Sequence, residues 1–478
     1  MQSLRAWAGR DGAEAKRLIS LGFPVFAALA SNRGLSTISL SFVGKIGSSE
    51  LAAAGLATSL ANVTGDSVLV GISSAMQTLC GQAFGAKALK EVGNWWQRAV
   101  LILWMTCIPI SLLWWFMEPL LLLIGQEPDV AHMTNMFLRC RIPGIFAYAL
   151  FQGTQAYLQS QGIVYPSMIS SIAVCLIHPL YTWGLTYHTS LSYTGAAFAY
   201  SISNTLQAAL LLIIVYVAGY QRSTFDGVSG EAFKGWWTFF KLGLPSLLML
   251  GEWWASEIVT IAAGKLPQPQ ESLAAMSIFQ QTNALSFMLP LGLSIAVGIR
   301  VANELGAGQA ARAKHAALVA MEMSFVLAAT LGSTIFLARG QVGRVFTGDS
   351  ELLKVTARVM ILMAGYIGCD GLQTVLGGIL RGTGRQATAV PVIFFSYFVL
   401  ALPASYLFAF VLHWGVIGLS AGMFLGTICN SIIYAILCIR TDWQKGVEEA
   451  LERTGKSKEE QKALLDSNDE ENAHSEDA

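Results

Sequence analysis

The stretch KLGLPSLLMLGEWWASEIVTIAAG, from Lys241 to Gly264, has the length of a bilayer-crossing helix and carries two glutamates in its interior. A membrane span needs about 20 predominantly apolar residues. The whole chain of 478 residues has the same character, because 54% of its residues are hydrophobic and only 13% are charged. Its mean hydropathy is +0.53. Soluble domains carry a much larger charged fraction, so the sequence predicts an all-α polytopic membrane protein.

Apolar runs separated by polar breaks predict twelve transmembrane helices. Their expected spans are 18–43, 52–80, 94–123, 131–158, 164–187, 193–219, 235–264, 272–303, 313–339, 351–381, 387–411 and 414–438. Lys and Arg are more frequent in the loops on one side, which identifies the cytoplasmic side. We therefore expect both termini in the cytoplasm. An even number of helices also requires the termini to share a side.

An internal repeat predicts two lobes. The turn YLQSQGIVYP (157–166) after the fourth expected helix resembles ILRGTGRQATAVP (379–391) after the tenth. Separations of 222, 224 and 223 residues relate the pairs Gly162/Gly384, Pro179/Pro403 and Gly195/Gly418. Duplication of a six-helix unit would relate the two lobes by a pseudo-twofold axis along the membrane normal.

The repeat also suggests the domain boundaries. The expected regions are a cytoplasmic N-terminal segment (1–17), an N-lobe (18–219), an interlobe loop (220–234), a C-lobe (235–440) and an acidic cytoplasmic tail (441–478). The tail is expected to begin with a short surface helix, and its end has the composition of a disordered segment.

Acidic residues near the middle of the membrane are the strongest functional signal. Glu252 and Asp370 lie in the seventh and tenth expected helices. An ionised acid at a helix centre costs about 2.5 to 3.5 kcal/mol on insertion scales, so such acids usually face a cavity or a partner. Desolvation penalises their charged form and favours proton binding. Glu257, five residues after Glu252, projects about 140° away from it. These three acids are the candidates for proton and cation coupling.

Trp253 and Trp254 follow Glu252 directly and offer aromatic faces to a cationic substrate. A site that holds a proton or a cation in alternation is the simplest chemistry for an antiporter. The alternative is structural: a hydrogen-bonded Glu that ties helices together, with the Trp rings in plain packing. The sequence leaves both possibilities open.

A second charged pair is expected in the N-lobe. Arg33 lies in the first helix and Asp66 in the second, at depths that differ by roughly 6 Å at 1.5 Å per residue. A long arginine spans that difference, so the sequence predicts an intramembrane ion pair. Its role, as a gate, an anion site or a structural tie, stays open.

Several motifs resemble those of the multidrug and toxic compound extrusion (MATE) transporters, in particular their eukaryotic branch. They are FVGKIGSSELAAAGLA (42–57), NVTGDSVLVGISSAMQTLCGQAFGAK (62–87), GEWWASE (251–257), GIRVANELGAG (298–308) and LRGTGRQ (380–386). The resemblance covers residues 19–438. It implies a MATE-like fold and proton-driven efflux of organic cations, xenobiotics or secondary metabolites. It places Glu252, Asp370 and Glu257 in a C-lobe coupling site and Asn62 in the N-lobe. The other candidate cavity residues are Trp253, Trp254, Gln280, Gln281, Tyr366, Gln373 and Gln77.

Other classes of protein receive less support. The six histidines show no metal-binding spacing, and no phosphate-binding loop of the Walker type appears. An integral-membrane transferase would need a larger polar loop than any present here. A lipid-linked saccharide flippase or organic-anion exporter of the same superfamily, and sodium in place of proton coupling, are the alternatives. We expect no cofactor beyond H⁺ as the coupling ion, no metal, no nucleic-acid partner and a monomeric protein. The expected location is the plasma membrane or a vacuolar or lysosomal membrane.

Overall fold

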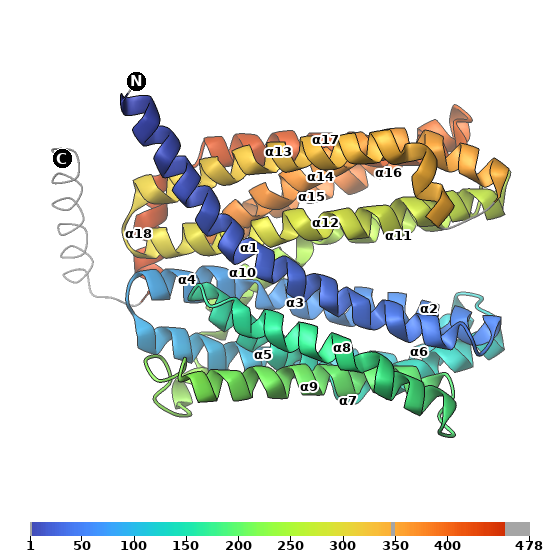
Figure 1. Cartoon of the computed structure of the whole chain (residues 1–478), viewed down its shortest axis with the longest axis horizontal. Helices are drawn as coiled ribbons and strands as arrows, with labels where there is room; N and C mark the ends of the chain where they lie inside the picture. Colours follow the sequence, from blue (N-terminus) through green and yellow to red (C-terminus); the bar gives the residue numbers. More distant parts are fainter. Residues whose placement is uncertain (1, 346–348, 455–478) are drawn as a thin grey trace. The chain divides into compact units, whose positions relative to one another are not determined.

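The computed structural model describes residues 2–345 and 349–454, and these form helices joined by short loops (Figure 1). The helices of the first half are α1 (Gln2–Val43), α2 (Ser48–Ala61), the π-helical turn η1 (Asn62–Asp66), α3 (Ser67–Ser73), α4 (Ala75–Gly85), α5 (Leu89–Trp115), α6 (Met117–Leu123), α7 (Pro128–Ser160), α8 (Tyr165–Tyr187) and α9 (Thr194–Ala218).

The second half begins with the short helix η2 (Gly230–Phe233) and is also helical. Its helices are α10 (Trp236–Leu248), α11 (Gly251–Ala263), α12 (Pro269–Gly306), α13 (Ala310–Val342), η3 (Gly343–Val345), α14 (Ser350–Gly382), α15 (Gln386–Ile393), η4 (Phe394–Ala401), α16 (Leu402–Tyr406), η5 (Leu407–Val411), α17 (Gly415–Ile439) and α18 (Trp443–Arg453). The disorder expected at the end of the acidic tail falls on residues 455–478, outside the described part of the chain.

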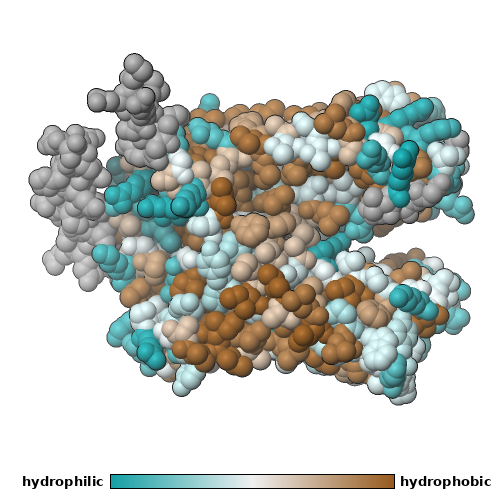
Figure 2. Space-filling view, in the orientation of Figure 1, coloured by the Kyte–Doolittle hydropathy of each residue, from teal (hydrophilic) through white to brown (hydrophobic). Residues whose placement is uncertain are grey.

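The predicted all-α fold class is confirmed. Each of the twelve expected spans corresponds to one long helix or to a run of shorter helices in direct succession. In the described residues, nine helices are long and apolar enough to cross a membrane. Of the other expected spans, 131–158 lies in the continuous but more polar helix α7, and the other two contain breaks, such as the one between α10 and α11. Within each unit, hydrophobic side chains cover the middle of the helices and hydrophilic ones gather toward their ends (Figure 2).

The chain divides into two compact units whose boundaries differ from the expected lobes. One unit contains residues 24–247, and the other contains residues 1–23 together with 248–478. One boundary therefore lies inside α1, next to Pro24, and the other lies at the end of α10, close to Pro245. The boundaries after Phe23 and Leu247 are 224 residues apart, which matches the spacing of the sequence repeat. The first helix of each repeat thus changes unit at the corresponding residue, which polar breaks in the sequence cannot reveal.

The segment expected as a separate cytoplasmic N-terminus is the beginning of α1. Glu14 is buried and accepts hydrogen bonds from Arg300 of α12, at 2.8 Å from Nε and 3.2 Å from Nη2. Glu304 forms a salt bridge with the same guanidinium, with 2.7 Å between Oε1 and Nη2. Buried charges are retained only when they are paired, so this cluster fixes the start of α1 within its unit.

Backbone geometry supports the sequence repeat. Gly162 and Gly384 both end a long helix with a positive φ, 75° and 76°, which favours glycine. Gly195 and Gly418 both lie where a helix backbone passes too closely to admit a side chain: a Cβ on Gly195 would meet Leu185, and a Cβ on Gly418 would meet Phe408. The same turns and the same close contacts therefore recur about 223 residues apart.

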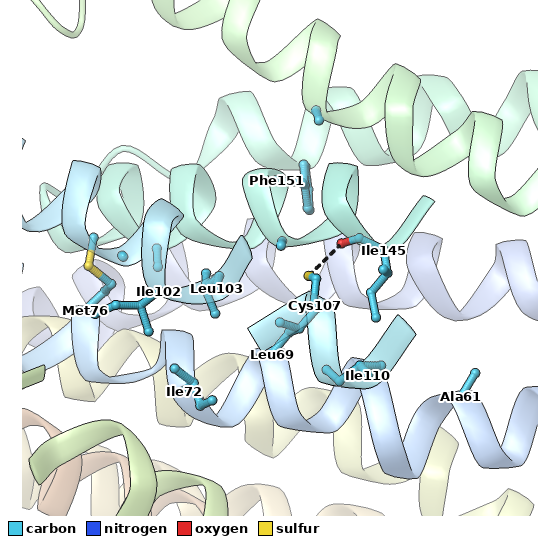
Figure 3. Close-up of a cluster of buried hydrophobic side chains, with 14 of the residues drawn as sticks. Ala61, Leu69, Ile72, Met76, Ile102, Leu103, Cys107, Ile110, Ile145 and Phe151 are labelled. Carbon is cyan, nitrogen blue, oxygen red and sulfur yellow. Dashed lines mark hydrogen bonds between the residues drawn. The ribbon is translucent and has the colours of Figure 1, made fainter. Parts of the chain in front are cut away.

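A hydrophobic core fills the 24–247 unit. Side chains from α3, α5 and α7 interdigitate there, among them Leu69, Leu103 and Phe151 (Figure 3). Cys107 lies in this core, 3.7 Å from the carbonyl oxygen of Ile145. All seven cysteines are free thiols, as expected for residues that pack as small hydrophobic side chains.

Candidate functional site

An interruption of the seventh span places Glu252 at a helix start. Helix α10 ends at Leu248, α11 begins at Gly251, and Glu252 lies in the first turn of α11. A carboxylate is favoured at this end of a helix, where free backbone N–H groups and the helix dipole are positive. Its side chain is only 9% exposed. The stretch 241–264 thus folds as a broken helix, with its first acid immediately after the break.

Glu252 and Asp370 share one amide group. The Nε2 atom of Gln373 lies 2.6 Å from Oε2 of Glu252 and 2.9 Å from Oδ1 of Asp370. The hydroxyl of Tyr366 donates to the other oxygen of Glu252 at 2.8 Å. All four side chains are buried. Two predicted coupling acids and two predicted cavity residues, from α11 and α14, therefore form one buried hydrogen-bonded group, which we call the acid pair site.

Tyr397 and Asn430 complete the acid pair site and fix the orientation of Gln373. Asn430 of α17 donates to Oε1 of Gln373 at 2.6 Å, and the hydroxyl of Tyr397 donates to the same oxygen at 3.0 Å. Thr427 lies 3.1 Å from the Tyr397 hydroxyl. With its oxygen surrounded by donors, Gln373 must turn its amide nitrogen toward the two acids.

The amide nitrogen of Gln373 has more acceptors than hydrogens. Its two hydrogens face Glu252, Asp370 and the oxygen of Tyr397, which is 2.8 Å away. A carboxylate only accepts hydrogen bonds, whereas a protonated carboxyl also donates one. A proton bound to one acid would therefore supply the missing donor and remove the repulsion between two negative charges. The geometry is suited to holding a proton or another positive charge.

The acid pair site opens into a small cavity of about 70 Å³. Glu252 and Gln373 line it, together with Trp253 and with Arg381 of α14. Arg381 donates to the hydroxyl of Ser294 at 2.8 Å. A water molecule occupies about 30 Å³ of liquid, so the cavity has room for about two waters or a small cationic group. The Glu252 side chain therefore borders a cavity inside the protein.

The remaining C-lobe candidates lie apart from this group. Glu257, the third candidate for coupling, is exposed and lies about 140° around the helix from Glu252. Gln280 donates to α11, at 3.2 Å from the carbonyl oxygen of Ser256 and 3.2 Å from the hydroxyl of Thr260. Gln281 is exposed. Glu257, Gln280 and Gln281 are therefore not part of the acid pair site.

The two tryptophans differ in their surroundings. Trp253 is 40% exposed and packs edge-on against Phe287, with ring centroids 5.7 Å apart. Trp254 is half-buried, and its indole N–H has no hydrogen-bond partner among the described residues. Trp253 lines the cavity beside Glu252, whereas Trp254 has an indole N–H group that makes no hydrogen bond with the described residues.

The predicted Arg33–Asp66 ion pair is corrected by the structure. Asp66 accepts from Arg141 of α7, with 3.0 Å between Oδ2 and Nη2. The Arg141 guanidinium also stacks over the ring of Tyr200, 4.1 Å from its centroid. Arg33 is half-buried on α1. Depth along two neighbouring helices suggested Arg33, but the partner comes from a third helix, α7, where Arg141 lies thirteen residues after Pro128.

The other N-lobe candidates belong to the same 24–247 unit. Asn62 begins the π-helical turn η1, which ends at Asp66. Such turns insert an extra residue into a helix and frequently mark functional sites. Gln77 is 7% exposed, and its side-chain oxygen has no hydrogen-bond partner among the described residues.

Sequence reasoning missed Tyr397, Asn430 and Arg141. Asn430 gave a detectable signal, because it is a polar residue inside the apolar run GTICNSIIYAIL. Tyr397 stands among aromatic neighbours in FFSYFVL and gave none. It lies in the π-helical turn η4, whose register a helical wheel does not describe.

Comparisons with known proteins agree with the fold and the motifs. A family model described as MatE matches residues 24–183 and 245–407. Protein DETOXIFICATION 12 of Arabidopsis thaliana is 35% identical over 448 residues, 93% of each chain. Protein DETOXIFICATION 37 of the same plant is 34% identical over 95% of this chain and 90% of the relative.

Solved structures give the same result. The crystal structure of the eukaryotic MATE transporter AtDTX14 superposes with a TM-score of 0.89 at 32% identity, over 93% of this chain and 99% of the other. The bent form of the Vibrio cholerae MATE transporter VcmN has a TM-score of 0.79 at 16% identity, over 93% and 99% of the two chains. This second likeness concerns the fold alone.

Proposed function

Because the chain belongs to the MATE family of multi-pass membrane transporters, we propose that it exports organic cations in exchange for protons. The chain is thus a transporter and not an enzyme, and its relatives are named detoxification proteins. The acid pair site carries the proposal, since it holds two buried carboxyl groups bridged by one amide.

The acid pair site supports exchange because it favours one bound positive charge. Two ionised carboxylates on one amide repel each other in surroundings of low dielectric constant. A proton on either Glu252 or Asp370 relieves this repulsion, and so does a cation in the adjoining cavity. Binding of the proton and of the cation then compete. Competition of this kind is the thermodynamic basis of antiport.

The carboxyl group and the aromatic rings that line the cavity beside Glu252 favour a cationic group. Trp253 and Phe287 line it with aromatic surface, which attracts cations within about 6 Å of a ring centroid. Arg381 contributes a positive charge to the same lining and donates to Ser294. The role proposed for Arg381 is to help expel the cation once Glu252 binds a proton.

The proposed cycle uses the break in the seventh span. Protonation of Glu252 or Asp370 from the outer or luminal side releases the cation. The proton then leaves toward the cytoplasm and a new cation binds. Movement is expected at Met249 and Leu250, between α10 and α11. Two glycines of α14 are closely packed, since a Cβ on Gly371 would lie 3.1 Å from Pro290 and a Cβ on Gly378 would overlap the carbonyl oxygen of Ser294.

Transport in proteoliposomes tests the proposed function. The full chain is reconstituted, and uptake of a radiolabelled organic cation is measured under an imposed pH gradient and, separately, a sodium gradient. Glu252→Gln and Asp370→Asn should each reduce proton-driven uptake by about tenfold or more, because contacts to charged groups are worth about 1.5 to 3 kcal/mol. The exposed acid of the same helix provides a matched control, so Glu257→Gln should retain uptake.

The outcomes separate the alternatives. If uptake is driven by the sodium gradient and does not depend on the pH gradient, the coupling ion at these acids is sodium rather than the proton. Undiminished proton-driven uptake by Glu252→Gln at equal expression would contradict the assignment of the acid pair site. Preference for anionic solutes would favour the anion exporter or flippase alternative. The same vesicles, with protease applied to either side, test the expected cytoplasmic termini.

A further inference from the structure

A second cavity lies in the 24–247 unit and takes no part in the mechanism above. Its volume is about 240 Å³, and it is lined by the start of α5, the ends of α7 and α9, and the loop that follows α9. The loop is fastened to α5: Gln97 donates to the carbonyl oxygen of Gly227 at 3.1 Å and accepts from the backbone of Ser229 at 2.9 Å. The wall formed by the loop is therefore a fixed part of the cavity.

Aromatic rings form three walls of this cavity. The rings of Trp96 and Phe225 are nearly perpendicular, at 83°, with centroids 5.6 Å apart. Tyr157 lies 5.9 Å from Trp96 at 45°. The polar atoms of these rings are used elsewhere, since the indole N–H of Trp96 donates to Thr154 at 3.2 Å and the Tyr157 hydroxyl bonds to Thr224. Trp96 and Tyr157 therefore offer only their aromatic surface to a bound molecule.

One polar atom in the lining has no partner. Gln221 lines the cavity, and its side-chain oxygen is buried without a hydrogen-bond partner among the described residues. A buried acceptor without a donor keeps its partial negative charge unneutralised, and a positive charge in the cavity would be attracted toward it. None of the described lining residues carries a charge that would repel a cation.

We propose that this cavity, the aromatic cage of Trp96, Tyr157, Phe225 and Gln221, binds a quaternary or N-methylated ammonium group. Perpendicular aromatic faces are the recognised solution for such groups, because the negative faces of the rings surround a cation that needs no hydrogen bonds of its own. The polarised methyl groups also carry positive charge toward the Gln221 oxygen. A neutral hydrocarbon group would gain the same burial but would leave that oxygen without a positively charged neighbour.

Two sources can supply this ammonium group. One is a free organic cation, for which the cage would be a second binding site apart from the acid pair site. The other is the choline headgroup of a phospholipid, because the neighbouring Tyr216 lines the cavity and is 76% exposed on α9. The chemistry of recognition is the same in both cases.

Equilibrium binding of radiolabelled choline tests the proposal. The full chain carries Glu252→Gln in every sample, so that the acid pair site is weakened and a failure of the proposed function leaves the result interpretable. Phe225→Leu keeps most of the volume and removes the ring, and Gln221→Leu removes the oxygen. Phe233→Leu is the matched control, because Phe233 belongs to the same interlobe segment and is 70% exposed.

We expect Phe225→Leu to weaken choline binding about fivefold or more, from a cation–π contribution of about 1 kcal/mol or above. Gln221→Leu should also weaken choline binding, because it removes the partial negative charge of the amide oxygen. Phe233→Leu should bind as the parent does. The neutral isostere 3,3-dimethylbutan-1-ol should compete much more weakly than unlabelled choline. Equal competition by the isostere, or binding unchanged by both cage variants, would overturn the proposal.

A final comparison identifies the source and guards against misfolding. Loss of choline binding in phosphatidylcholine nanodiscs, with retention in phosphatidylglycerol nanodiscs, would assign the cage to the lipid headgroup. Equal binding in both would assign it to free cations. Phe225→Tyr, which keeps an aromatic face, should restore binding where Phe225→Leu loses it. Failure of this rescue in a variant with the parent's thermal stability would also count against the cage.

Discussion

Removing either partner of the Asp66–Arg141 ion pair should destabilise the 24–247 unit strongly. The Arg141 side chain is 4% exposed and that of Asp66 is 16% exposed, with 3.0 Å between the paired atoms. Two unit charges at this distance attract by about 5.5 kcal/mol at an effective dielectric constant of 20. Desolvation offsets much of this attraction, but loss of one partner leaves a buried charge alone, and such losses typically cost about 3 to 5 kcal/mol.

The assay is a double-mutant cycle on Asp66→Asn and Arg141→Leu, in which the free energy of unfolding is measured by denaturant titration in mixed micelles. We expect each single variant to lose about 3 kcal/mol or more and the double variant to lose less than the two combined, by at least about 2 kcal/mol. The double variant loses less stability than the two single losses combined because it leaves no unpaired buried charge.

Arg139 supplies the matched control for this cycle. It lies two residues earlier on α7, is half-buried, and donates to the carbonyl oxygen of Trp115 at 3.0 Å. Arg139→Leu combined with Asp66→Asn should therefore be additive within about 0.5 kcal/mol. Additive losses for Arg141→Leu with Asp66→Asn, or coupling of equal size for Arg139, would refute the assignment of Arg141 as the partner of Asp66.

Three further predictions concern packing, the start of α1 and the acid pair site. Gly195→Ala and Gly418→Ala should each cost about 1 to 3 kcal/mol of stability by overpacking, whereas Gly184→Ala, with open space around it, should cost little in the same denaturation assay. Glu14→Gln should lower the midpoint of thermal unfolding, because it weakens two bonds to Arg300, and the exposed Glu448→Gln should leave it unchanged. Gln373→Leu should reduce proton-driven cation uptake about tenfold or more, by removing the bridge between Glu252 and Asp370; uptake at the parent's rate would contradict that role.

Sequence patterns predicted the helices well because burial in a membrane leaves long apolar runs with polar breaks. The division into units was less accessible, since α1 and the seventh span change unit in the interior of a span, at Phe23 and Leu247. The repeat spacing showed that the two boundaries should lie at corresponding residues. Only three-dimensional contacts show that the chain changes unit near Pro24 and near Pro245.

For the acid pair site, composition and contacts contributed differently. Glu252 and Asp370 were recognisable because an acid inside an apolar helix is costly, and Gln373 and Tyr366 stood close by in sequence or motif. Tyr397 and Asn430 come from other helices, and no spacing within one helix predicts such contacts. The partner of Asp66 was wrong for a related reason: depth along neighbouring helices cannot decide between Arg33 and Arg141 when a third helix supplies the closer guanidinium.

The most direct test of the central claim is to count the protons released when a cation binds. Calorimetric titration of the purified full chain with an organic cation, near neutral pH in two buffers of different ionisation enthalpy, gives that number through the linkage between binding and protonation. We predict release of about one proton per cation by the parent protein and close to none by Glu252→Gln. Cation binding without proton release by the parent, or equal release by both proteins, would contradict the exchange of proton and cation at Glu252 and Asp370.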